Sequence, residues 1–172
     1  MESIARKHPE FLTVTCLEWK HLLAGDHMKQ LIVDSLAFLS RDGRIIVYGF
    51  VIMVNHFHVI WQMKGEHNRE EVQRDFLKYA GQQILKHLRN EKSSQLDKLM
   101  VNAKDRKHQV WERNSLGIAL WSTKAIWGKL EYIHNNPVQA GLCEYPWEYT
   151  YSSAGFYLKK DTKWDFLVHI DG

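Results

Sequence analysis

The stretch RIIVYGFVIMVNHFHVIWQM, residues 44–63, most constrains how this chain of 172 residues can fold. Its longest apolar run, Ile45 to Val54, has ten residues, which is about half the length of a membrane-spanning helix. The stretch is rich in β-branched and aromatic residues, which favour strands. Val54-Asn55 interrupts it near the middle. The sequence therefore predicts two strands of one sheet and no transmembrane helix.

Three other segments have apolar residues at the spacing of an amphipathic helix, namely residues 26–39, 69–89 and 122–135. Asp26 and Ser122 are the predicted N-caps of the first and third helices, because short polar side chains can accept a bond from a free backbone N–H there. The third helix is predicted to end at Asn135-Asn136-Pro137, since a proline disfavours helical geometry in the residue before it.

The remaining strands are shorter. FLTVTC, residues 11–16, is predicted to be the first strand, and residues 109–111 and 118–120 could be short strands or irregular segments. The resulting order is strand, helix, strand, strand, helix, strand-like segment, helix. This order is typical of an α+β fold of ferredoxin-like type, an antiparallel sheet with helices packed on it.

Length and composition favour a single globular domain. The chain is 45% hydrophobic and 25% charged, and a chain of this length can bury a core of its own. We expect one domain over residues 1–172, with a core at about 11–156, a polar insertion at about 90–107 and a tail at 157–172. MESIARKHPEF has no apolar stretch of signal-peptide length, and Cys16 and Cys143 have no metal or redox spacing. We expect a cytoplasmic protein with reduced thiols that does not enter a membrane.

Positive charge is concentrated in one segment. Between Arg74 and His108 there are nine Lys or Arg against four Asp or Glu, a local charge of +5 in a chain whose net charge is +3. The segment can be a solvated helix face with a charged loop, or it can bind a phosphate backbone. Under the second interpretation, Lys78, Lys86 and Arg89 are the predicted DNA contacts.

His56-Phe57-His58 is the first candidate for chemistry. Residues two apart on a strand point to the same face, so His56 and His58 would lie together while Phe57 points to the other face. Two imidazoles on one face can bind a divalent metal. The alternative is a pair of half-exposed histidines without a ligand, but two polar rings in so apolar a strand pair call for an explanation.

Tyr132 is the second candidate. The predicted apolar stripe of its helix consists of Ile126, Leu130 and Ile133. Tyr132 lies roughly 130° from the centre of that stripe, at 100° per residue, so it should not be a core tyrosine. Lys129 lies beside it, and Asn136 is one turn further on. Tyr132 can be an ordinary surface tyrosine or a phenol presented as a nucleophile.

Two blocks of the sequence resemble a known family. VIMVNHFHVIW resembles the HUH motif strand of single-tyrosine transposases. YIHNNPVQAGL, followed by WEYTYSSA, resembles the C-terminal block of the REP-associated tyrosine transposases. The resemblance runs from about Phe11 to Phe156, and the two blocks together are much more specific than either alone. The segment VWERNSLGIALWS departs from the family in lacking a histidine after its first Trp.

The resemblance implies a ferredoxin-like domain in which His56 and His58 bind Mg²⁺ or Mn²⁺, with Asn136 completing the metal site. It implies that Tyr132 attacks single-stranded DNA, forms a 5′-phosphotyrosine and releases a 3′-OH. Hairpin repeats are the implied DNA partners, Lys129 is a further expected DNA contact, and a homodimer is possible. A free tyrosine has a pKa of about 10, so a metal held against the phosphate would assist the attack.

Two other functions remain open at this point. A domesticated protein could bind a DNA repeat without turnover, using the same surface. An RNA-binding ferredoxin-like module would stack bases on sheet aromatics, although its K/R-G-F/Y strand pattern is absent from the sequence. Covalent trapping of DNA on Tyr132 separates the enzyme from both.

Overall fold

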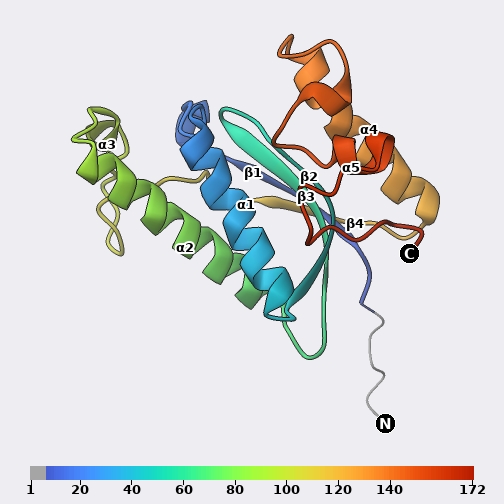
Figure 1. Ribbon diagram of the computed structural model, residues 1–172. Coiled ribbons are helices and arrows are strands. Elements are labelled where there is room, and N and C mark those ends of the chain that lie inside the picture. The colour runs from blue at the N-terminus through green and yellow to red at the C-terminus, as the bar shows by residue number, and fades with distance from the viewer. Residues whose placement is uncertain (1–6) are drawn as a thin grey trace.

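The computed structural model describes residues 7–172. Most of the N-terminal segment in which the sequence predicts no signal peptide, residues 1–6, lies outside the described residues. Its sheet has the order β2-β3-β1-β4 with every neighbouring pair antiparallel (Figure 1). The strands are β1 (Glu10–Thr15), β2 (Ile45–Ile52), β3 (His56–Met63) and β4 (Leu116–Ala119). With α1 (Asp26–Arg41) between β1 and β2, and α2 (Arg69–Asn90) between β3 and β4, this is the ferredoxin-like α+β fold that was predicted.

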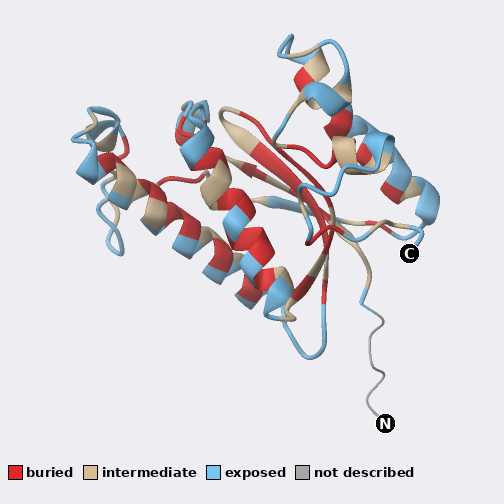
Figure 2. Cartoon of the chain, in the orientation of Figure 1, coloured by how far each residue is buried: buried red, intermediate tan, exposed pale blue. Residues whose placement is uncertain are grey.

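The helices cover the two faces of the sheet differently. Helices α1 and α2 lie on one face, and α4 (Thr123–Gln139) and α5 (Ala154–Lys159) lie on the other (Figure 1). Buried residues line both contacts (Figure 2). Side chains alternate along β3, so Phe57 and Trp61 join the core under α1 and α2 while Ile60 joins the core under α4. His56 and His58 have the same parity as Ile60 and therefore belong to the α4 face. No helix within residues 7–172 combines the length and the apolar character needed to cross a membrane.

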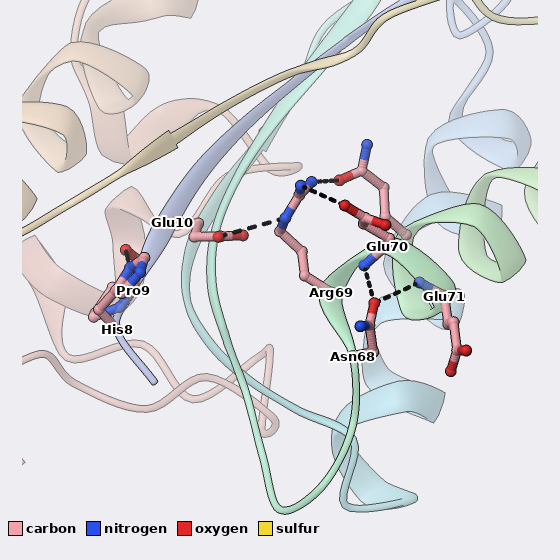
Figure 3. A network of polar contacts seen from close by, with 8 residues as sticks. His8, Pro9, Glu10, Asn68, Arg69, Glu70 and Glu71 are labelled. Atoms are coloured by element: carbon pink, nitrogen blue, oxygen red, sulfur yellow. Dashed lines mark hydrogen bonds and ion pairs between the residues drawn. The ribbon is translucent and has the colours of Figure 1, made fainter. Parts of the chain in front are cut away.

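Figure 3 shows how the start of α2 is tied to β1. Asn68 caps the helix, since its Oδ1 accepts from the backbone N of Glu70 at 2.8 Å and of Glu71 at 3.3 Å. Arg69 Nε lies 3.5 Å from Glu10 Oε1 at the beginning of β1. These contacts fix the N-terminal end of α2 against the sheet.

The predicted N-cap is correct for α4 and wrong for α1. Ser122 Oγ accepts from Ala125 N at 3.1 Å. The N-cap of α1 is Gly25, because the backbone N–H groups of Met28 and Lys29 donate to Gly25 O. Asp26 is already the first helical residue, where its charge still suits the positive end of the helix dipole.

The predicted end of the third helix is also wrong. α4 continues to Gln139 with Pro137 inside its last turn. The proline removes only one intrahelical bond there, and the chain goes on bonding around it: Asn136 O accepts from Ala140 N at 3.0 Å, and Pro137 O accepts from Leu142 N at 2.9 Å. Asn136 consequently keeps helical geometry and lies one turn after Tyr132 on the same side of the helix.

A glycine lets α4 approach the sheet closely. The β2–β3 register shifts between Val47 and Gly49. A Cβ on Gly49 would lie 2.5 Å from Leu130 Cδ2, so only glycine fits without a shift of α4 or of that side chain. Next to it, buried Ser153 Oγ accepts from Phe50 N at 3.0 Å and bonds His134 Nε2 at 2.8 Å. These contacts join α4, β2 and the segment before α5.

The last residues of the chain cover the free edge of β2. Val168 N donates to Val47 O at 3.0 Å, and Phe166 and Leu167 are buried in the main core. The segment set apart as a tail from its sequence thus contributes to the core. The polar insertion contains one short helix, α3 (Gln95–Lys98). Within residues 7–172, two 3-10 turns occur outside this insertion, at Leu17–Trp19 and Pro146–Glu148.

Candidate active site

Strand β3 and helix α4 bring four of the predicted site residues together. The rings of His56 and His58 lie side by side, with centroids 5.0 Å apart. His56 Nε2 is 3.2 Å from Asn136 Oδ1. The ring of Tyr132 lies 5.7 Å from that of His58. Residues 80 positions apart in the chain thus form one polar cluster on the α4 face.

Strand β1 fixes the orientation of His58. Thr13 pairs with His58 across the two strands, and a hydrogen bond of 2.9 Å joins Thr13 Oγ1 to His58 Nδ1. Phe11, two residues before Thr13, stacks on the His58 ring at 5.1 Å. When Nδ1 donates to the threonine, Nε2 is left with its lone pair free. Sequence reasoning missed Thr13 and Phe11, because only the β1–β3 register places them beside the histidine.

His56 is held from both ends of its ring. Its Nδ1 lies 2.8 Å from Asn55 Oδ1, and its Nε2 faces Asn136. A neutral imidazole donates from one nitrogen only. If Nδ1–H donates to Asn55 Oδ1, then Nε2 carries a lone pair and cannot donate to Asn136 Oδ1. Two acceptor atoms then face each other, and a cation bound by both would stabilise this arrangement.

Both imidazoles are neutral at pH 7. Burial, with smaller contributions from the neighbouring His56 ring and the Lys129 ammonium, lowers the pKa of His58 to about 3. Burial also lowers the pKa of His56, although the Asn136 oxygen, which can accept a hydrogen bond from the protonated ring, opposes this. Neutral imidazole is the form that binds a metal.

The cluster fits a divalent metal through two imidazoles and one amide oxygen. Two ligand atoms at about 2.1 Å from an octahedral ion and at right angles to each other are about 3 Å apart. The 3.2 Å between His56 Nε2 and Asn136 Oδ1 agrees with this spacing. No group of three or more His, Cys, Asp or Glu in residues 7–172 is placed to hold a metal. Asn136 Oδ1 is therefore the candidate for a third protein ligand at this site.

Tyr132 is presented to solvent beside the cluster. It is 53% exposed, which confirms that it is not a core residue. Lys129 Nζ lies 5.5 Å from the centre of its ring and 4.7 Å from that of Phe11. An exposed phenol and a cation thus lie next to the buried His58 ring.

The other predicted DNA contacts are not part of this cluster. Lys78, Lys86 and Arg89 are exposed on α2, which packs on the opposite face of the sheet. Lys78 and Arg89 line a groove of about 1,100 Å³ between α2 and residues 105–115, whereas Lys86 does not line it. Four further cations line this groove, namely Arg74, Arg106, Lys107 and Arg113.

Known structures resemble this fold. No protein-family model matches the sequence, and no curated protein matches it significantly. The chain superposes on a REP-associated tyrosine transposase bound to a REP hairpin with a TM-score of 0.60 and 19% identity, covering 90% of this chain and 83% of that one. It also superposes on a candidate transposase from Deinococcus radiodurans with a TM-score of 0.52 and 11% identity, covering 78% of this chain and 95% of that one. The chain therefore has the fold of the transposases that its two sequence blocks resemble.

Proposed function

We propose that this protein is a metal-dependent, transposase-like enzyme that cleaves and rejoins single-stranded DNA through Tyr132. One observation carries the proposal: an exposed phenol lies beside two imidazoles of one strand, one of which contacts the amide of Asn136. The fold shared with a REP-associated tyrosine transposase supports it.

The reaction exchanges one phosphate ester for another. Tyr132 Oη attacks the phosphorus of a DNA phosphodiester and loses its proton to solvent. The bond from phosphorus to the 3′-oxygen breaks, which leaves a free 3′-OH and a 5′-phosphate joined to Tyr132. Attack by a 3′-OH on this phosphotyrosine rejoins the strand and restores the phenol. The number of phosphate ester bonds is unchanged, so no external energy source is needed.

His56, His58 and Asn136 would hold Mg²⁺ or Mn²⁺ in this enzyme. When bound, the cation would offset the charge of the phosphate and orient it for in-line attack. Imidazole ligands favour Mn²⁺ over Mg²⁺. Thr13 keeps the His58 ring in the orientation needed, and burial keeps both imidazoles unprotonated.

The cations of the chain would bind the DNA backbone in two places. Lys129, next to the Tyr132 ring, would contact the phosphate under attack. Lys78 and Arg89 would contact the backbone in the groove beside α2. Since the similar transposase is bound to a REP hairpin, hairpin-bearing DNA is the partner we propose for this chain.

The two alternative functions make different demands. A base-stacking RNA-binding module needs exposed aromatics on the sheet, but α4 covers this face and Phe11 is buried beneath it. A non-catalytic DNA-repeat binder would share every DNA contact and differ only in forming no covalent adduct.

The test is covalent trapping. Labelled single-stranded DNA carrying a hairpin is incubated with protein and Mn²⁺ and run on a denaturing gel. The parent should form a denaturant-resistant species, and Tyr132→Phe should form none while melting at the same temperature. Tyr79→Phe is the matched control, because Tyr79 is 56% exposed on the opposite side of the sheet. A parent that forms no adduct with any hairpin-bearing strand contradicts the proposal and favours the binder.

Metal binding is tested separately by calorimetry. His56→Ala and His58→Ala should each abolish Mn²⁺ binding and adduct formation, and a chelator should stop adduct formation by the parent. Far-UV circular dichroism checks that both variants stay folded. A double variant that binds Mn²⁺ with unchanged affinity would exclude this metal site.

A further inference from the structure

Trp19 is exposed beside the candidate metal site. Its ring is 59% exposed and lies edge-on to the ring of His56, with centroids 5.9 Å apart. Glu18 and Trp19 both have positive φ, 51° and 57°, a conformation that side-chain-bearing residues rarely adopt. Strained backbone of this kind concentrates at functional sites, where surrounding contacts hold it in place.

Hydrogen bonds on both sides hold this turn. Trp19 N donates to Cys16 O at 2.9 Å, and Leu17 N donates to Val110 O at 2.8 Å. Glu18 N donates to Glu112 Oε1 at 2.5 Å. The indole thus projects from a fixed backbone, not from a free loop, and can act as a preorganised surface.

The turn lies between the metal site and the basic groove. On one side Trp19 touches His56. On the other side the neighbouring Glu18 bonds Glu112, which lines the groove together with Lys78, Arg89 and Arg113. A DNA strand that runs from His56 past Glu112 to the cations beside α2 would pass this turn.

We propose that Trp19 is a stacking platform for a base of the single-stranded DNA next to the cleaved phosphate. This inference rests on the proposed function and adds a positioning residue to it. Bases of any sequence stack on an aromatic ring, so the contact would hold the strand without reading it. A base fixed against Trp19 would set the position of the adjacent phosphate relative to His56, as an in-line attack requires.

The experiment separates base stacking from phosphate contacts. Binding is measured by fluorescence anisotropy in the Tyr132→Phe background with Mn²⁺, so that no covalent adduct forms. Two labelled strands of about 12 nucleotides are compared. One is oligothymidylate, and the other has the same backbone without bases. Trp19→Ala should weaken binding of the thymidylate strand about tenfold and leave the abasic strand within about twofold, and Trp19→Phe should retain most of the affinity.

Phe38→Ala is the matched control. Phe38 is also 59% exposed but lies on α1, on the opposite face of the sheet. It should change neither affinity. The inference alone is overturned if Trp19→Ala leaves thymidylate binding unchanged, or weakens both strands equally, while Tyr132 still forms its adduct. If the protein binds neither strand and the parent forms no adduct, the proposed function fails together with the inference.

Discussion

The two faces of the sheet use the same strands for different purposes. On the α1 and α2 face, β3 presents Phe57, Val59 and Trp61, all fully buried in the main core. On the α4 face it presents half-buried His56 and buried His58, both of which are hydrogen-bonded by polar side chains. Alternation along one strand therefore places Phe57 and its neighbours in the main core, and places the histidines of the proposed site on the α4 face together with Ile60.

The two sheet faces also differ in the surroundings of an exposed tyrosine. Tyr79 on α2 and Tyr132 on α4 are 56% and 53% exposed. Tyr79 borders an apolar pocket of about 430 Å³ between α1 and α2, together with Phe38 and Phe76. Tyr132 lies beside His58 and Lys129. Exposure does not distinguish the two phenols, and only the polar surroundings of Tyr132 suit it for attack on a phosphate.

The largest expected effect is a difference in stability between alanine variants of two neighbouring residues on β3. Phe57→Ala should lower the free energy of unfolding by about 3–5 kcal/mol, because it leaves a cavity in the main core. His56→Ala should lower it by about 1 kcal/mol or less, while abolishing Mn²⁺ binding. Urea unfolding measures both. If the two variants lose similar stability, the division between the faces is wrong.

A pH effect should come from His134 on the α4 side. Burial lowers the pKa of His134 from 6.5 to about 4. Between these values the unfolded chain binds a proton that the folded protein does not, so stability is full above pH 6.5 and falls as the pH drops toward 4. The part of this loss that belongs to His134 should approach about 3 kcal/mol, and His58, whose pKa burial lowers to about 3, adds a further loss that His134→Gln retains. The free energy of unfolding of His134→Gln is measured by urea unfolding across this pH range. If it falls with pH as steeply as that of the parent, His134 does not contribute to the effect.

Two buried serines, one on each side of the sheet, should differ in their effects on stability and on adduct formation. Ser153→Ala removes the partner of Phe50 N and His134 Nε2, so it should cost about 1–3 kcal/mol and slow adduct formation by loosening α4. Ser35→Ala on α1 removes only a bond to the helical carbonyl of Leu31, so it should cost less than about 1 kcal/mol and leave the adduct unchanged. Equal losses of stability and of adduct in the two variants would contradict the role given to Ser153.

The smallest expected effect is a change in the salt dependence of DNA binding by the groove beside α2. Lys78→Gln with Arg89→Gln should weaken binding of single-stranded DNA and reduce the salt slope of log Kd by about 1.4, since each phosphate contact contributes about 0.7. Lys86→Gln, on the same helix but outside the groove, should alter the slope much less. Titrations at several salt concentrations decide this. An unchanged slope for the double variant would mean that this part of α2 is merely solvated.

Local periodicity explains what could be predicted. The shared face of His56 and His58 follows from strand alternation, and the exposure of Tyr132 follows from the angle between helical residues. The turn at Val54-Asn55 and the cap at Ser122 depend on a few neighbouring residues, so they too could be predicted. The ferredoxin-like order of elements followed from these patterns together.

Long-range geometry explains what could not be predicted. Thr13 reaches His58 only because β1 and β3 pair in one particular register. Trp19 reaches His56 because of two positive φ angles that no residue type nearby indicates. The position of Pro137 inside α4 depends on its burial and on bonds made after it. The proline rule alone therefore predicts the wrong end for this helix.

The most direct test of the central claim locates the DNA on the protein. The adduct formed with Mn²⁺ is digested with protease and nuclease, and the modified peptide is sequenced by mass spectrometry. We expect a nucleotide attached through its 5′-phosphate to Tyr132 and an unmodified Tyr79. Attachment to Tyr79 or to any other residue would contradict the role proposed for Tyr132.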